Sequence, residues 1–77
     1  MKNLIESLVK PLVDYPEEVT IEAVEEDNRI IYKLTVHKDD IGKVIGKRGR
    51  VAKAIRTVVY AYAHTTENKK VFLEITE

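Results

Sequence analysis

The stretch that organises this chain is VIGKRGR, at residues 44–50. Two glycines bracket two cations, and apolar residues lie on both sides of them. Glycine adopts positive φ without strain and lets a backbone approach a ligand closely. Because apolar helical patterns point into a core and loops point outward, this stretch predicts a basic surface loop between two helices. A basic loop with an accessible backbone suits a polyanion, and nucleic acid is the obvious candidate.

The residues on either side of this loop have helical patterns. From Arg50 onward, apolar residues recur at three-to-four spacing and predict a helix that ends near residues 63–64. Its expected inward stripe consists of Val51, Ala54, Ile55, Val58, Val59 and Tyr62. Before the loop, Asp39 and Asp40 are typical of a helix start, and Gly46 is expected to end that short helix.

The rest of the chain adds one helix and three strands. Residues 2–14 have helical apolar spacing, which Pro11 is expected to interrupt near residue 9 or 10. Alternating residues predict strands at 18–25 and 30–37, separated by a polar turn, and a last strand at 70–75. The second strand is expected to turn Ile30, Tyr32, Leu34 and Val36 to one face. The order α-β-β-α-α-β predicts an α+β fold: one domain, residues 1–77, with a three-stranded sheet covered by helices on one face.

Composition narrows the possible functions. The chain has 77 residues and no cysteine, so it has one thin core and neither disulfides nor thiolate chemistry. No apolar run approaches the roughly 20 residues that a membrane span needs. Charged residues interrupt the apolar positions at the N-terminus, so we expect no signal peptide and a cytoplasmic protein.

The net charge of zero hides a polarised distribution. Residues 41–66 contain six basic residues and no acidic one, whereas residues 14–27 contain seven acidic residues and no basic one. Chance segregation of charge is one explanation. Because the basic run coincides with the glycine loop, we interpret it as one oriented site for an anionic partner.

At this point the motif resembles a known family. The run at residues 44–55, an apolar pair, Gly-x-x-Gly and then apolar positions at fixed offsets, is similar to the signature of a KH domain. The order of elements resembles the type II form. The length, the N-terminal helix and the ending at residues 56–60 resemble the small stand-alone bacterial KhpA family (YlqC-like), over nearly the whole chain.

The resemblance implies a single-stranded RNA or DNA ligand of about four nucleotides, clamped at its backbone by the loop. The expected RNA-binding residues are Gly46, Lys47, Arg48, Gly49, Lys43, Ile45, Arg50 and Lys53. For Lys43, Arg50, Lys53 and Arg56 the alternative is an ordinary solvated helix face. Phosphate contacts orient a strand but do not distinguish bases. Base selection is therefore expected in an apolar groove that Ile41, Val44, Ile45 and the edge of the strand at residues 34–36 could line.

Other chemistry finds little support. A Walker loop needs four residues between its glycines and a Ser or Thr after the lysine, and neither condition is met here. His37 and His64 lie far apart in the sequence, so we expect no metal site. With no nucleophile paired to a base and no cofactor motif, we expect no catalytic residues, no cofactor and no enzyme activity.

The long helix is apolar on more than one side, which predicts a second contact surface. Residues 58–63 carry no charge, and a dimer interface is expected at Val58, Tyr60 and Tyr62. The resemblance implies a homodimer or a heterodimer with a KhpB (Jag-like) KH protein, and a role in RNA regulation, cell elongation and envelope growth. Two readings stay open: an RNA-binding module, with RNA chaperone activity, or a protein-interaction adaptor with little RNA binding.

Overall fold

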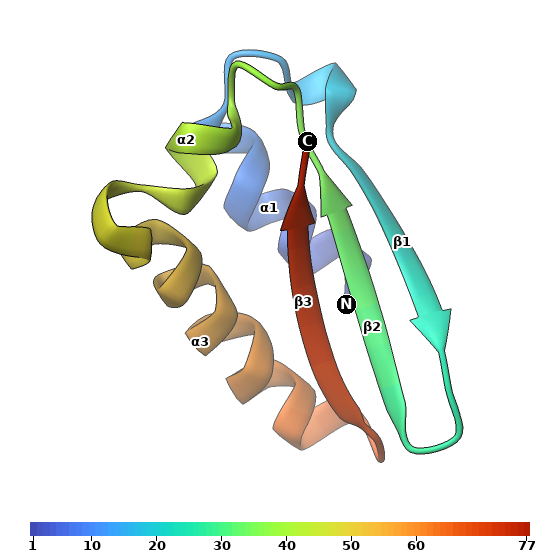
Figure 1. The fold of residues 1–77 in the computed structure, drawn as a ribbon. Coiled ribbons are helices and arrows are strands. Elements are labelled where there is room, and N and C mark those ends of the chain that lie inside the picture. The colour runs from blue at the N-terminus through green and yellow to red at the C-terminus, as the bar shows by residue number, and fades with distance from the viewer.

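The computed structural model describes residues 1–77, and its elements follow the predicted order (Figure 1). The helices and strands are α1 (Lys2–Val9), β1 (Thr20–Glu25), β2 (Arg29–Thr35), α2 (Ile41–Ile45), α3 (Arg50–Thr66) and β3 (Lys70–Thr76). Three short 3-10 turns lie between them: η1 (Lys10–Leu12), η2 (Pro16–Glu18) and η3 (Lys47–Gly49). None of the helices has the length and apolar character needed to cross a membrane.

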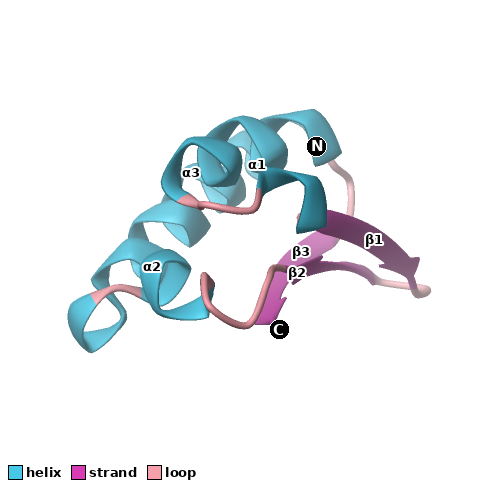
Figure 2. Ribbon diagram, turned by 90° about the horizontal axis from the view of Figure 1, so that it is seen from above, coloured by secondary structure: helices cyan, strands magenta, loops and turns pink.

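The strands form one sheet in the order β1-β2-β3, with β1 antiparallel and β3 parallel to β2. The three helices lie on one face of this sheet, as Figure 2 shows from above. The predicted α+β architecture is therefore confirmed. Because parallel strands need a crossover connection, the segment from α2 to α3 leaves the sheet and carries the basic loop away from it.

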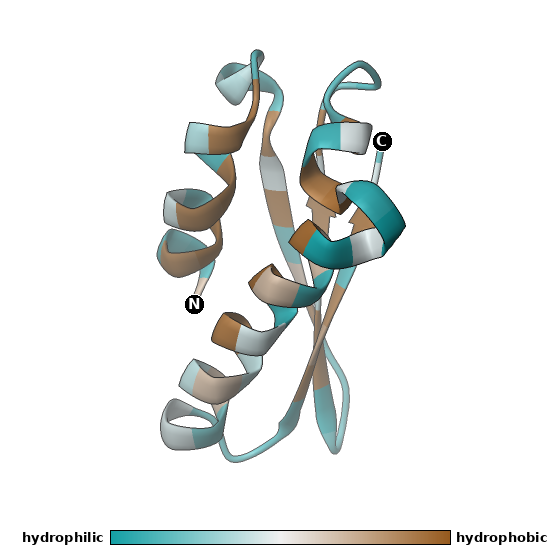
Figure 3. Ribbon diagram, turned by 90° about the vertical axis from the view of Figure 1, so that its left-hand side faces the viewer, coloured by the Kyte–Doolittle hydropathy of each residue, from teal (hydrophilic) through white to brown (hydrophobic).

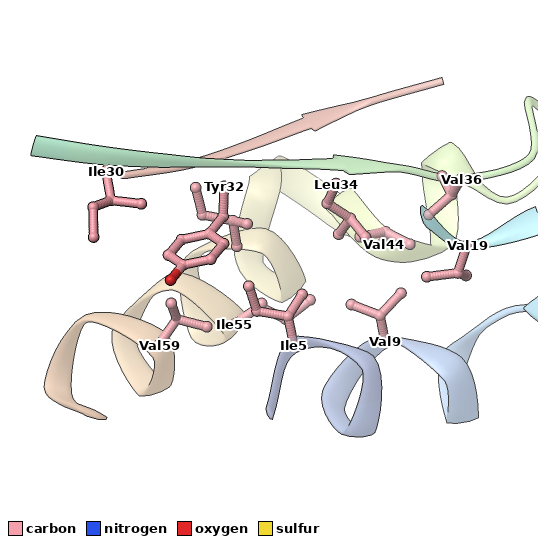
Figure 4. Close-up of a cluster of buried hydrophobic side chains, with 11 residues drawn as sticks. Ile5, Val9, Val19, Ile30, Tyr32, Leu34, Val36, Val44, Ile55 and Val59 are labelled. Atoms are coloured by element: carbon pink, nitrogen blue, oxygen red, sulfur yellow. The ribbon is translucent and has the colours of Figure 1, made fainter. Parts of the chain in front are cut away.

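The core lies between the sheet and the helices (Figure 4). β2 turns its alternate side chains inward as predicted, and α1, α2, α3 and β3 each add apolar residues to the same cluster. Its members include Ile5, Val9, Ile30, Tyr32, Leu34, Val36, Val44, Ile55, Val59 and Leu73. Each element therefore has one face fixed by the core, and this determines which side chains remain for other contacts.

Helix α1 ends at Val9, as predicted from Pro11, and η1 continues the chain. Two strand boundaries differ from the sequence-based prediction. Strand β1 starts only at Thr20, because η2 occupies the residues just before it. Strand β2 ends at Thr35 rather than at residue 37, although the Val36 N–H still donates to the Thr76 carbonyl at 3.1 Å.

The predicted inward stripe of α3 is wrong in half of its members. The buried residues of α3 are Ala52, Ile55, Val59 and Ala63, whereas Val58 and Tyr62 are each 45% exposed. The helix carries two overlapping apolar stripes, and three-to-four spacing cannot choose between them. Packing in the fold buries the stripe that contains the small Ala52 and Ala63.

Helix α3 also runs past its predicted end to Thr66. The hydroxyls of Thr65 and Thr66 both donate to the Tyr62 carbonyl, at 2.8 and 3.0 Å. The Glu67 N–H also donates to the Ala63 carbonyl at 2.8 Å, and these three hydrogen bonds lie in the added last turn.

Candidate nucleic-acid interface

The turn at residues 46–49, hereafter the GKRG turn, joins α2 to α3 and projects at the left of Figure 1. Gly46 and Gly49 have φ of 75° and 72°, and Arg48 between them has φ of 55°. Residues other than glycine, asparagine and aspartate seldom adopt positive φ. Three positive φ values in four residues reverse the chain tightly and place Lys47 and Arg48, both exposed, at its tip.

Gly46 has a packing role besides its conformation. A Cβ atom at this position would lie 2.9 Å from Val51 Cβ and 3.0 Å from Val51 N, closer than non-bonded atoms approach. Gly49 has open space around its Cα, so its requirement is conformational. The two glycines of the motif are therefore required for different reasons. Gly49 is required by its positive φ alone, whereas Gly46 is required by its positive φ and by its close packing against Val51 at the start of α3.

Four cations surround the GKRG turn without any carboxylate partner. Lys47, Arg48, Arg50 and Lys53 are exposed, and none of them takes part in the ion pairs of the protein, all of which lie elsewhere. The turn also abuts the N-terminus of α3, which no side chain caps and where the helix dipole adds partial positive charge. In Figure 3 the turn is the hydrophilic segment between the apolar parts of α2 and α3.

Lys43 is placed differently from the other predicted cations. Its ammonium group pairs with the Asp14 carboxylate and lies 3.6 Å from Asp40 Oδ1. The hydrogen bond to Asp14 is the main cause that raises the pKa of Lys43, with both carboxylate charges adding to it. Lys43 is therefore not a free cation at the predicted site. Its ion pairs connect α2 to the segment that follows α1.

Asp40 is the centre of that tie. It occupies the predicted position at the start of α2, but its side chain makes no capping hydrogen bond to that helix. Its carboxylate is fully buried and accepts the N–H groups of Asp14 and Tyr15 at 3.1 and 3.0 Å. Burial alone would raise the pKa of Asp40, but these two donors and the neighbouring Lys43 and His37 outweigh it and lower the pKa.

The apolar residues of α2 separate into core and surface. Val44 is fully buried in the core, whereas Ile45 is 39% exposed beside the GKRG turn and Ile41 is half-buried. Of the residues expected to line a base-binding groove, Val44 is therefore excluded as a surface contact, and so are the buried Leu34 and Val36 of the neighbouring strand segment. Ile45 is an apolar surface next to the cations.

Arg56 and Tyr60 lie on the flank of α3 that faces β3, a contact that the sequence did not predict for either of them. Arg56 Nε donates to the Leu73 carbonyl at 3.2 Å, and the Leu73 N–H donates to the Tyr60 hydroxyl at 3.3 Å. Leu73 thus has both outward main-chain groups paired to α3 side chains. The spacing of Arg56 and Tyr60 places them on one helix face, but only the packing shows that this face meets the sheet edge.

The residues predicted for a dimer interface do not share one face. On a helix with 3.6 residues per turn, positions two apart point to nearly opposite sides. Tyr60 faces β3, whereas Val58 and Tyr62 lie on the other flank, where Ala54 is also exposed. We call Ala54, Val58 and Tyr62 the second flank of α3.

A three-stranded sheet in this order, a two-helix crossover between its parallel strands and a Gly-x-x-Gly turn within that crossover together define a type II KH domain. The comparisons with known proteins agree. A family described as "KhpA/KhpB, KH domain" matches residues 2–75, and the chain belongs to this family.

Its relatives cover essentially the whole chain. The protein named "RNA-binding protein KhpA" of Oceanobacillus iheyensis is 63% identical over 75 residues, which are 97% of this chain and 99% of the relative. Proteins of the same name are 57% identical over 77 residues in Listeria monocytogenes serovar 1/2a, with full coverage of both chains. In Chlamydia trachomatis the identity is 54%, over 100% of this chain and 97% of the relative.

A solved structure shows the same fold at low identity. The crystal structure of Era with MgGDPNP and nucleotides 1506–1542 of 16S ribosomal RNA matches with a TM-score of 0.66 and 19% identity. The match covers 95% of this chain and 28% of Era. The similarity is therefore one of fold, and it covers one part of Era.

Proposed function

We propose that this protein binds single-stranded RNA by holding its sugar–phosphate backbone at the GKRG turn. The observation that carries the proposal is the set of four exposed, unpaired cations around a backbone with three positive φ values. Relatives of nearly identical length bear the name RNA-binding protein, which supports RNA as the ligand. Single-stranded DNA has the same backbone charge, and a DNA oligonucleotide of the same sequence serves as the comparison.

In this proposal the cations and Ile45 have different tasks. Lys47, Arg48, Arg50 and Lys53 neutralise phosphates, which gives affinity and orientation without sequence preference. Ile45 offers an apolar contact for a base that the held backbone turns toward α2. The function is binding, and no reacting group is assigned to the site.

The test reverses charge on the turn alone. Aspartate tolerates the positive φ of position 48 better than most residues, so Lys47→Asp/Arg48→Asp changes charge with little change in fold. We expect the affinity for a single-stranded RNA to fall at least a hundredfold at moderate salt. The matched control is Lys2→Asp/Lys38→Asp, two exposed lysines outside every ion pair. Equal affinities for the two double variants would refute the proposal.

We further propose that the second flank of α3 is a protein-contact surface, used by a second copy or by a KhpB/Jag-like KH protein. Val58 and Tyr62 are each 45% exposed and form an apolar strip without charge. Tyr60, also predicted for this interface, lies on the opposite flank. In this proposal the complex acts in RNA chaperone activity and post-transcriptional regulation, linked to cell elongation and envelope growth, as the resemblance to the KhpA family implies.

This second surface also supports the alternative function, an adaptor that assembles through α3 and binds little RNA. Val58→Glu puts a charge in the strip, and Thr57→Glu puts the same charge on an exposed position of α3 about 100° further round the helix. We expect Val58→Glu to lower the mass measured by light scattering to that of a monomer while Thr57→Glu does not. RNA binding at wild-type strength by the Lys47→Asp/Arg48→Asp variant, together with retained assembly, would favour the adaptor.

A further inference from the structure

A hollow lies at the far end of α3 from the GKRG turn. It has a volume of about 680 Å³ and forms where the last turns of α3, the following loop and the start of β3 meet. Its lining includes the aromatic and polar residues Tyr60, His64, Glu67, Asn68, Lys70 and Phe72. It is separate from the four cations and Ile45, none of which lines it.

The lining combines aromatic rings with balanced charge. Phe72 is 43% exposed and Tyr60 is 37% exposed, so both rings are accessible. The lining holds two lysines and one carboxylate: Lys69 is already paired with Glu25 at 3.2 Å, and this leaves Lys70 against the opposite charge of Glu67. Without an excess of positive charge the hollow is poorly suited to a phosphate, whereas accessible rings offer a stacking surface to a neutral base.

One flank of α3 connects the hollow to the GKRG turn. Lys53, Arg56, Tyr60 and His64 follow one another at helical spacing, and the contacts of Arg56 and Tyr60 with Leu73 show that this flank faces β3. It begins at Lys53, one of the unpaired cations, and ends at His64 in the hollow, about 16 Å away at 1.5 Å per residue. A strand that follows this flank from the turn therefore reaches Phe72 at its other end.

We propose that the hollow is a second nucleic-acid contact, in which a base of the same RNA strand stacks beyond the roughly four nucleotides that a KH domain holds. This inference rests on the proposed function of the GKRG turn. It makes a separate claim: affinity rises with strand length, and the gain depends on the ring of Phe72.

The experiment compares two lengths of oligouridine RNA, roughly four and roughly ten nucleotides, by fluorescence anisotropy. The variants are Phe72→Leu, which keeps an apolar side chain next to Ile31 on β2 but removes the ring, and Phe72→Tyr, which keeps the ring. Thermal unfolding of each variant shows that the domain remains folded. We expect the long RNA to bind wild type and Phe72→Tyr at least tenfold more tightly than the short one.

In Phe72→Leu we expect that gain to vanish while the affinity for the short RNA stays at the wild-type value. The inference is overturned if Phe72→Leu retains the full gain, or if wild type shows no gain with length. Both of those results leave binding of the short RNA intact, and with it the proposed function. If wild type binds neither length, the proposed function fails and this inference fails with it.

Discussion

The three glycines of this chain predict three different effects of one substitution, glycine to alanine. Gly42 lies inside α2 with no atom within 4 Å of an added Cβ, so alanine fits and stabilises the helix by about 1 kcal/mol. Gly49 has equally open space but φ of 72° and ψ of 16°. The left-handed conformation costs an alanine about 1–2 kcal/mol.

Gly46 combines both penalties. Its φ of 75° with ψ of 176° falls in a region that essentially only glycine occupies, which costs of order 1–3 kcal/mol. The added Cβ also meets the side chain and backbone of Val51, with Cβ–Cβ and Cβ–N separations of 2.9 and 3.0 Å. We therefore expect Gly46→Ala to destabilise the fold by about 3 kcal/mol or more.

Urea unfolding followed by circular dichroism measures these differences, provided the m-value is unchanged. In a domain of this size 1 kcal/mol moves Tm by about 4–8 °C. Gly42→Ala is therefore expected to raise Tm by about 4–8 °C and Gly46→Ala to lower it by about 12 °C or more. In Gly46→Ala/Val51→Ala only part of the loss is recovered, because the backbone of Val51 still obstructs the added Cβ. A Gly46→Ala variant as stable as Gly49→Ala would refute this account of the turn.

Three further predictions test individual contacts. Asp40→Asn leaves one of two N–H donors without its acceptor and lowers Tm at pH 7. Because the pKa of Asp40 in the folded protein lies below its ordinary 3.8, its contribution is complete above that pH and is lost as pH falls through the folded pKa. The stability gap between wild type and Asp40→Asn, followed by urea unfolding, should therefore narrow below about pH 3.8, and a gap that widens there would contradict the assignment. Tyr60→Phe removes the acceptor of the Leu73 N–H and should cost about 1 kcal/mol of unfolding free energy; no cost would mean that the bond contributes nothing. Lys53→Gln should make the salt dependence of RNA binding shallower by about 0.7 in log–log slope, whereas Lys43→Gln should leave it nearly unchanged because Lys43 is already paired; equal effects would return Lys43 to the RNA site.

The order of the elements and the position of the GKRG turn follow from the sequence because the signals are local. Alternation marks the strands, Pro11 marks the break after α1, and two glycines mark the turn. These features depend on residues within one or two turns of one another, and the structure agrees with them.

The features that depend on tertiary packing could not be predicted from the sequence, because their partners are distant in the chain. The apolar residues of α3 fit two stripes equally well, and only packing in the whole fold buries Ala52 and Ala63 rather than Ala54 and Val58. Asp40 is a residue typical of a helix start, but the N–H groups that its carboxylate accepts lie 25 and 26 residues away. In the sequence Lys43 cannot be distinguished from Lys47, Arg48 and Arg50, and only the fold shows that it is paired with Asp14 and Asp40.

The measurement that tests the central claim most directly is the salt dependence of RNA affinity in wild type and in Lys47→Asp/Arg48→Asp. Four phosphate-neutralising cations predict a slope of log affinity against log salt of about −3 on a single strand. The double variant should lose most of its affinity and at least half of that slope. A wild-type slope near zero, or the same slope and affinity in both proteins, would contradict the assignment of the GKRG turn as the RNA-binding site.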